Sequence, residues 1–182
     1  MRPAVIDYLS EPSMEQPPRT PIVSPALLGL MVCAAAFTWL VNHGLPDPVA
    51  SHFDAGGEPD GFMPRDEYIA IMTAVTVVVP LFIAMLTNFA LSRPGIRINL
   101  PHRDHWLAPE RRAETVGFLR QQSSRFAALL VLFMCYAQWL AARANSATPP
   151  ILDPGLFVLG LGAFIACVAL GIVRLLRRFR RE

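Results

Sequence analysis

The sequence predicts an all-α integral membrane protein, a four-helix bundle whose N-terminus and C-terminus both lie in the cytoplasm. The 182-residue chain is 53% hydrophobic and only 16% charged, whereas about 25% of the residues in soluble domains are charged. The charges are confined to the connecting segments, so that four long stretches contain none. All sixteen cations are arginines, and they are distributed unevenly among those connecting segments.

Each uncharged stretch is long enough to cross a bilayer as a helix. About 20 helical residues span a hydrocarbon core roughly 30 Å thick, and a buried helix of a soluble protein is rarely so long without a charge. Within a membrane domain over residues 21–176, the sequence predicts helices at about 22–43, 66–92, 109–145 and 154–176. Residues 1–20 are polar and Pro-rich and lack the apolar run of a secretory signal. They are predicted to form a disordered cytoplasmic tail, and residues 177–182 a basic one.

Single residues support these helices. Pro64 suits the start of the second helix, where the acidic Asp66 and Glu67 would interact favourably with the helix dipole. The third helix is expected to extend from the cytoplasm into the membrane, where Tyr136 and Gln138 need polar partners from neighbouring helices or the interface.

Two helices carry small residues along one face, which allows close packing. We expect these faces to pack within one chain rather than between two copies. They comprise Gly29, Cys33 and Ala36, and Gly162, Ala166 and Ala169.

The arginines predict the orientation in the membrane. Two lie in the N-terminal segment, seven between residues 92 and 125, and five from Arg174 onward, whereas the other two connections hold only Arg65 and Arg143. Arginine is enriched on the cytoplasmic side of multi-pass proteins. Both termini are therefore predicted to be cytoplasmic, in a cell (inner or plasma) membrane, with residues 44–65 as the outer loop.

The outer loop combines turn-forming residues with polar side chains. Gly56-Gly57 permits positive φ and Pro59-Asp60-Gly61 is a strong turn sequence, so the loop is predicted to be ordered. Three interpretations compete. The polar side chains hold only the loop's own backbone, the loop recognises an extracellular peptide or lipid, or a divalent cation such as zinc or manganese binds. The metal would use His52, Asp54 and Asp60; a ligand would use His52, Phe53, Asp54, Asp60 and Gly61.

The loop between the second and third helices is predicted to lie at the membrane interface. Tryptophans such as Trp106 are enriched at the membrane interface, and Arg111 and Arg112 can pair with lipid phosphates. His102 and His105 are three residues apart, but no cysteine or second histidine pair accompanies them, so an interfacial segment is favoured over a metal site there.

Several functional classes are disfavoured. No acidic or basic residue lies well inside a predicted span, although proton pumps and ion-coupled carriers usually need one. No GxSxG, HExxH or phosphate-binding glycine loop is present. The arginines flank apolar spans rather than forming a soluble basic face, so a nucleic-acid partner is not expected. No cofactor is predicted.

Two segments of the chain carry short motifs. The first comprises Leu45-Pro46, His52-Phe53-Asp54, Gly57 and Pro59-Asp60-Gly61, and the second is His105-Trp106-Leu107-Ala108-Pro109-Glu110-Arg111-Arg112. With these motifs the chain resembles a bacterial family of small membrane proteins of unknown function, in which Tyr stands in place of His105. The family's shared domain also forms the N-terminal part of SdpI-type immunity proteins. The resemblance covers roughly residues 20–145 and implies a polytopic membrane protein with an immunity or signalling role by analogy.

The leading functional hypothesis is a non-enzymatic membrane module. Its partners would be the lipid bilayer and an envelope ligand, a toxic peptide or a lipid, bound by the outer loop. One alternative is a metal-dependent membrane enzyme or metal-handling protein that uses the loop's His and Asp residues. Another is a small transporter component. The sequence leaves the oligomeric state open.

Overall fold

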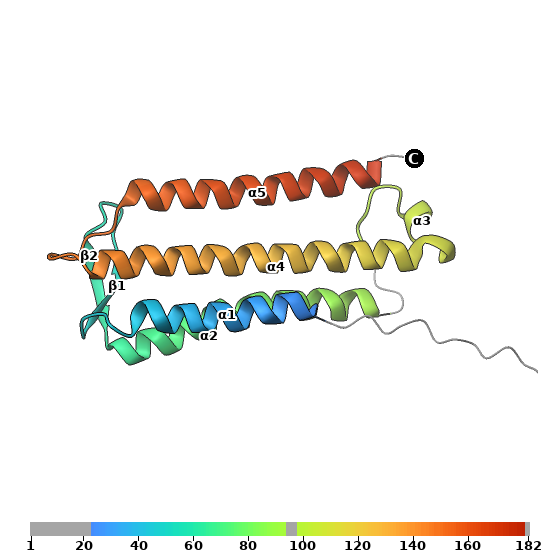
Figure 1. Ribbon diagram of the computed structural model, residues 1–182. Helices are drawn as coiled ribbons and strands as arrows, with labels where there is room; N and C mark the ends of the chain where they lie inside the picture. The colour runs from blue at the N-terminus through green and yellow to red at the C-terminus, as the bar shows by residue number, and fades with distance from the viewer. Residues whose placement is uncertain (1–22, 94–97, 181–182) are drawn as a thin grey trace, which may run out of the picture.

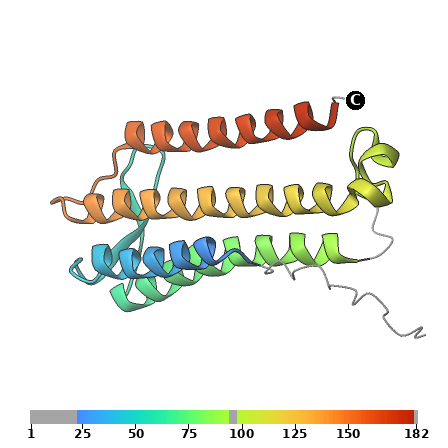
Figure 2. The same cartoon turned by 45° about the vertical axis from the view of Figure 1, so that its right-hand side comes forward.

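The chain forms four long helices that lie side by side, with a β-hairpin at one end (Figures 1 and 2). A computed structural model describes residues 23–93 and 98–180, so the predicted tail over residues 1–20 lies outside the described residues. The long helices are long and apolar enough to cross a membrane. They are α1 (Pro25–Asn42), α2 (Arg65–Ser92), α4 (Pro109–Asn145) and α5 (Pro154–Arg180), and the short α3 (Arg103–Trp106) lies at the end opposite the hairpin.

The main difference from the predicted helix bounds is at the end of α5. The prediction places residues 177–182 in a basic tail, but α5 remains helical to Arg180. Arginine and leucine are good helix formers, and basic residues in the last turn interact favourably with the helix dipole. Phe179 is also buried, and its carbonyl accepts a hydrogen bond from Trp106 Nε1 at 3.2 Å. Tertiary contacts thus hold the last turn of α5 in place.

Helix α4 is the centre of the bundle. It packs against α1 and α2, and these three helices enclose an apolar core that includes Met31, Ala84 and Val131. Helix α5 packs mainly on α4, and none of its apolar span is buried within the chain. The fold is therefore three closely packed helices with a fourth on the outside of α4, where most of its surface would face lipid.

The small-residue faces do not pack within the chain, which contradicts the prediction. A Cβ added at Gly29 or Gly162 would meet no atom within 4 Å, and the other four small residues, Cys33, Ala36, Ala166 and Ala169, are exposed on the surface of the bundle. Helix α1 instead buries the face that carries Leu27, Met31 and Ala34. The small residues that do pack between the helices are Ala34, Ala84 and Ala127, whereas the predicted small-residue faces are left on the outside.

One polar cluster joins the three core helices. Gln138 of α4 accepts a hydrogen bond from Asn42 Nδ2 of α1 at 2.9 Å. Its own amide group donates to the hydroxyls of Thr38 and Thr76, each at 3.3 Å. All four side chains are buried. The polar partners predicted for Gln138 are therefore neighbouring helices, and those of Tyr136 are similar, because its hydroxyl donates to the Leu156 carbonyl of α5 at 2.7 Å.

The predicted outer loop is ordered, as expected, but it contains two strands, which the all-α prediction omits. β1 (Val49–Phe53) and β2 (Pro59–Met63) form an antiparallel hairpin. The Asn145 side chain, at the end of α4, accepts from Ala50 N at 2.8 Å and donates to Ala50 O at 2.9 Å. Pairing satisfies backbone groups that would otherwise be buried without partners, and it fixes the hairpin to α4.

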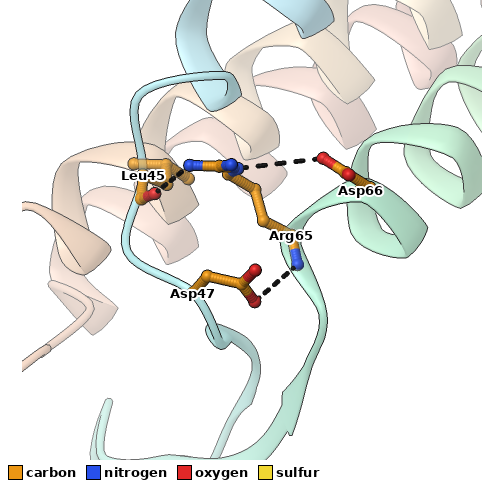
Figure 3. A network of polar contacts seen from close by, with 4 residues as sticks. All are labelled: Leu45, Asp47, Arg65 and Asp66. Carbon is orange, nitrogen blue, oxygen red and sulfur yellow. Dashed lines mark hydrogen bonds and ion pairs between the residues drawn. The ribbon is translucent and has the colours of Figure 1, made fainter.

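Arg65 and Asp47 fix the two ends of the hairpin segment to each other (Figure 3). The Arg65 guanidinium donates to the Leu45 carbonyl at 3.2 Å, and its backbone N–H donates to the Asp47 carboxylate at 3.2 Å. Asp66 lies 3.9 Å from Arg65 Nε. The Asp47 carboxylate thereby caps the first turn of α2, where a negative charge interacts favourably with the helix dipole.

Candidate functional site

A cavity of about 530 Å³ lies beneath the hairpin, and we call it the hairpin cavity. It is bounded by β1 and the turn after it, by α2 and α4, and by the beginning of α5. Its volume falls within the roughly 300–1,000 Å³ of typical small-molecule sites. The lining residues are Ser51, His52, Phe53, Asp54, Ala55, Tyr68, Met72, Met134, Ala137, Gln138, Ala141, Leu152, Pro154, Phe157 and Val158.

The walls of the hairpin cavity are apolar. Met72 and Met134 face it from α2 and α4, and Phe157 from α5. Methionine side chains are flexible and polarizable, so such walls can adapt to ligands of different shape. Ala137 and Ala141 contribute little side-chain volume on the α4 side, which leaves space for an apolar chain. The cavity is suited to an acyl chain or to apolar side chains.

The polar groups of the cavity lie at its hairpin side and at Gln138. His52 is exposed and its side chain forms no hydrogen bond with another residue of the described ranges, so its ring nitrogens can contact a ligand. Gln138 is only 4% exposed and is held by the polar cluster of α1, α2 and α4. A site with apolar walls and a few fixed polar groups fixes the orientation of an amphipathic ligand.

Asp54 serves mainly to hold the turn. Its Oδ1 accepts hydrogen bonds from Gly56 N at 2.8 Å and from Glu58 N at 2.9 Å. Asp54 therefore does what the first of the three interpretations of this loop predicts, because its side chain holds the loop's own backbone. Asp54 is also one of the residues that line the cavity.

The structure brings together three of the five predicted ligand residues. His52, Phe53 and Asp54 line the hairpin cavity, whereas Asp60 and Gly61, both on β2, do not. Gly61 has a different role, because it lies opposite His52 in the hairpin. A Cβ at Gly61 would lie 3.0 Å from the Cβ of His52, so glycine leaves room for the histidine.

The tip of the hairpin joins the connection between α4 and α5. Gly57 adopts φ +88°, as the Gly56-Gly57 sequence permits. Its carbonyl accepts a hydrogen bond from Leu152 N at 2.9 Å, and a Cβ at Gly57 would overlap the Leu152 carbonyl. Leu152 and Pro154 thereby become part of the cavity. Sequence reasoning missed them because nothing in their local pattern indicates this distant contact.

The predicted metal ligands are not gathered into a site. Within residues 23–93 and 98–180, no group of three or more His, Cys, Asp or Glu side chains is placed to hold a metal ion. His52, Asp54 and Asp60 therefore do not form such a group. The pair His102 and His105 gains no third ligand there either.

The predicted interface residues lie at the other end of the bundle. The Trp106 ring packs edge-on against Phe179, with ring centroids 5.3 Å apart. Arg111 and Arg112 are exposed, and the Arg111 guanidinium lies 2.8 Å from His105 Nδ1. Trp106 thus connects α3 to α5, and the interaction of the two arginines with lipid stays a prediction.

One comparison with known proteins matches the hairpin region. A family described as a domain of unknown function (DUF1648) matches residues 28–77, which run from α1 through the hairpin into α2. An uncharacterised protein of Archaeoglobus fulgidus is 40% identical over 83 residues. That match covers 42% of this chain and 45% of the archaeal protein, so the chain spans less than half of that relative's length. No solved structure matches the chain. The predicted link to SdpI-type proteins stays a prediction.

Proposed function

We propose that this multi-pass membrane protein recognises an amphipathic envelope ligand, a lipid or an apolar peptide, in the hairpin cavity. The observation that carries the proposal is that His52, Phe53 and Asp54 share one cavity with apolar residues of three membrane helices. The apolar part of a ligand would lie between α4 and α5. Its polar part would contact His52 and Gln138. Binding of this kind would serve immunity to a membrane-active peptide, or signalling.

The proposed orientation places the hairpin on the outer side, with both termini in the cytoplasm. The connections at the α3 end carry most of the arginines, whereas Arg65 and Arg143 are the arginines near the hairpin. Trp39 and Trp139, on the hairpin side of α1 and α4, are both largely exposed. Indoles at that level suit the membrane–water interface. The hairpin would then meet ligands of the cell envelope.

Recognition fits the site better than catalysis. The Asp54 carboxylate is occupied by two backbone N–H groups, and Gln138 is held by side chains of two other helices. These groups are fixed in position and can orient a ligand.

Photocrosslinking tests the proposal. The full chain is placed in nanodiscs with phosphatidylethanolamine that carries a diazirine in one acyl chain. In a second arm it is mixed with a 15-residue Leu-rich amphipathic peptide that carries photoreactive leucine. Tyr68 lines the cavity but is only 2% exposed. A crosslink at Tyr68 therefore reports a molecule inside the cavity rather than bulk lipid.

We expect a Tyr68 crosslink in at least one arm, and its loss in Ala137→Phe, which fills the cavity from α4. Ala36→Phe is the matched control, because Ala36 is exposed on α1 outside the cavity. If neither probe labels Tyr68, or if Ala137→Phe leaves the labelling unchanged, the proposal is wrong.

A further inference from the structure

A second cavity lies between α4 and α5, toward the arginine-rich end of the bundle. It has a volume of about 390 Å³ and is called the seam cavity. The Phe133 and Phe164 rings stack with centroids 4.8 Å apart. Since these residues lie between the parts of α4 and α5 that line the two cavities, the stack separates the seam cavity from the hairpin cavity.

The seam cavity is apolar along most of its length and cationic at one end. Its apolar walls include Phe126, Leu129 and Val168. Arg125 and Arg174 line its other end, and none of its lining residues is acidic. Neither arginine forms an ion pair with a residue that the structure describes; Arg125 donates to Gln122 Oε1 at 2.7 Å. The cavity therefore complements a molecule with an anionic head and an apolar chain.

The position of the two arginines matches the membrane boundary. Arg125 is the last charged residue before the apolar span of α4, and Arg174 is the first after that of α5. In a bilayer that the two apolar spans cross, both guanidinium groups would lie at headgroup depth, with the apolar walls extending toward the hydrocarbon core. Guanidinium groups bind phosphate with good geometry, and basic pockets between membrane helices bind acidic lipid headgroups.

We infer that the seam cavity binds one acidic phospholipid. Its phosphate would lie between Arg125 and Arg174, and part of an acyl chain would lie along Phe126, Leu129 and Val168. Gly171 leaves open space beside the arginines, because a Cβ there would meet no atom within 4 Å. The inference is independent of the proposed function, which concerns the opposite end of the α4–α5 contact.

Native mass spectrometry of the full chain tests this site. The detergent-solubilised protein is titrated with phosphatidylglycerol and with phosphatidylcholine of the same acyl chains. We expect one phosphatidylglycerol to be retained, and its affinity to fall by roughly tenfold or more in the double variant Arg125→Gln/Arg174→Gln, since each surface cation contributes measurably to acidic-lipid binding. The charge-matched control is Arg177→Gln/Arg180→Gln, which removes two exposed arginines of α5 outside the cavity.

A second pair of variants tests the shape of the site. Gly171→Phe fills the seam cavity and should abolish retention although both arginines remain. Gly162→Phe adds the same side chain to an exposed position of α5 and should leave retention unchanged. Equal losses in the two arginine double variants would show general charge attraction and overturn the inference. So would unchanged retention in Gly171→Phe, or competition by glycerol phosphate as strong as that by the whole lipid.

Discussion

Asn42 and Gln138 are 96 positions apart in the sequence but are joined by a buried hydrogen bond of 2.9 Å from Asn42 Nδ2 to Gln138 Oε1. Gln138 also donates to Thr38 and Thr76 and lines the hairpin cavity. One side chain therefore connects the packing of α1, α2 and α4 with the candidate ligand site. Changes at Gln138 should affect stability and binding together.

Gln138→Leu should destabilise the fold. The variant loses three hydrogen bonds, each worth about 0.6 kcal/mol on average between membrane helices, so a loss of about 1–2 kcal/mol is expected. The measurement is unfolding of the detergent-solubilised chain, with Gln121→Leu, an exposed position of α4, as the control. Equal stability of the two variants would show that the polar cluster contributes little.

Gly57→Ala should detach the hairpin tip from the connection before α5. A Cβ at φ +88° is strained and would overlap the Leu152 carbonyl; strain of this kind costs about 1–3 kcal/mol. Faster hydrogen exchange at the Leu152 amide is the expected result. Gly44→Ala serves as control, because a Cβ at Gly44 meets no atom within 4 Å. Unchanged exchange at Leu152 in Gly57→Ala would contradict the described contact.

Asp54→Ala and Asp54→Asn should separate the two roles of this carboxylate. Asparagine keeps an oxygen that can accept from Gly56 and Glu58, whereas alanine leaves both N–H groups without that partner. Exchange of these two amides should therefore accelerate in Asp54→Ala and change little in Asp54→Asn. A ligand that needs the negative charge would bind less well to both variants, whereas equal protection of the turn in all three proteins would contradict its assigned structure.

Trp106→Phe should loosen the last turn of α5. Phenylalanine keeps an aromatic ring against Phe179 but lacks the N–H that donates to the Phe179 carbonyl at 3.2 Å. We expect faster exchange of the final amides of α5, with Trp39→Phe as a control on the exposed surface of α1. If those amides exchange equally fast in the two variants, α5 does not depend on Trp106.

His52→Ala should weaken ligand binding without changing membrane insertion. His52 is exposed and lines the cavity, and its ring forms no hydrogen bond with another described residue. Its loss should therefore remove a ligand contact and little else. The probes are the photoreactive lipid and peptide used for Tyr68, compared at equal amounts of membrane-inserted protein. If Tyr68 is labelled to the same extent in His52→Ala as in the wild type, His52 does not contact the ligand.

The sequence predicts those features that depend on local composition. Uncharged stretches of about 20 residues indicate the spans, Gly56-Gly57 indicates the positive φ of Gly57, and the polarity of Gln138 indicates a need for partners. The strands are less predictable, because β1 is stabilised by Asn145, which is 95 positions away from Ala50. Strand pairing of this kind depends on tertiary contacts rather than on local propensity.

Local sequence patterns also do not predict the hairpin cavity or the placement of α5. Met72, Met134 and Phe157 are apolar residues of three different helices, and only packing brings them to one cavity. Small residues predict close helix contact in general, and α5 makes such a contact at Gly160, where a Cβ would overlap the Tyr136 ring. Gly162, two positions further along, faces outward.

The orientation of the hairpin tests the account most directly, because only an outward hairpin can meet an envelope ligand. Cys33, Cys135 and Cys167 are first replaced by alanine, and single cysteines are then introduced as Glu58→Cys in the hairpin turn and Arg112→Cys near the start of α4. Both positions are exposed. In intact cells, a membrane-impermeant maleimide should label Glu58→Cys at once and Arg112→Cys only after the membrane is opened. The reverse pattern, or labelling of both cysteines in intact cells, would contradict the account.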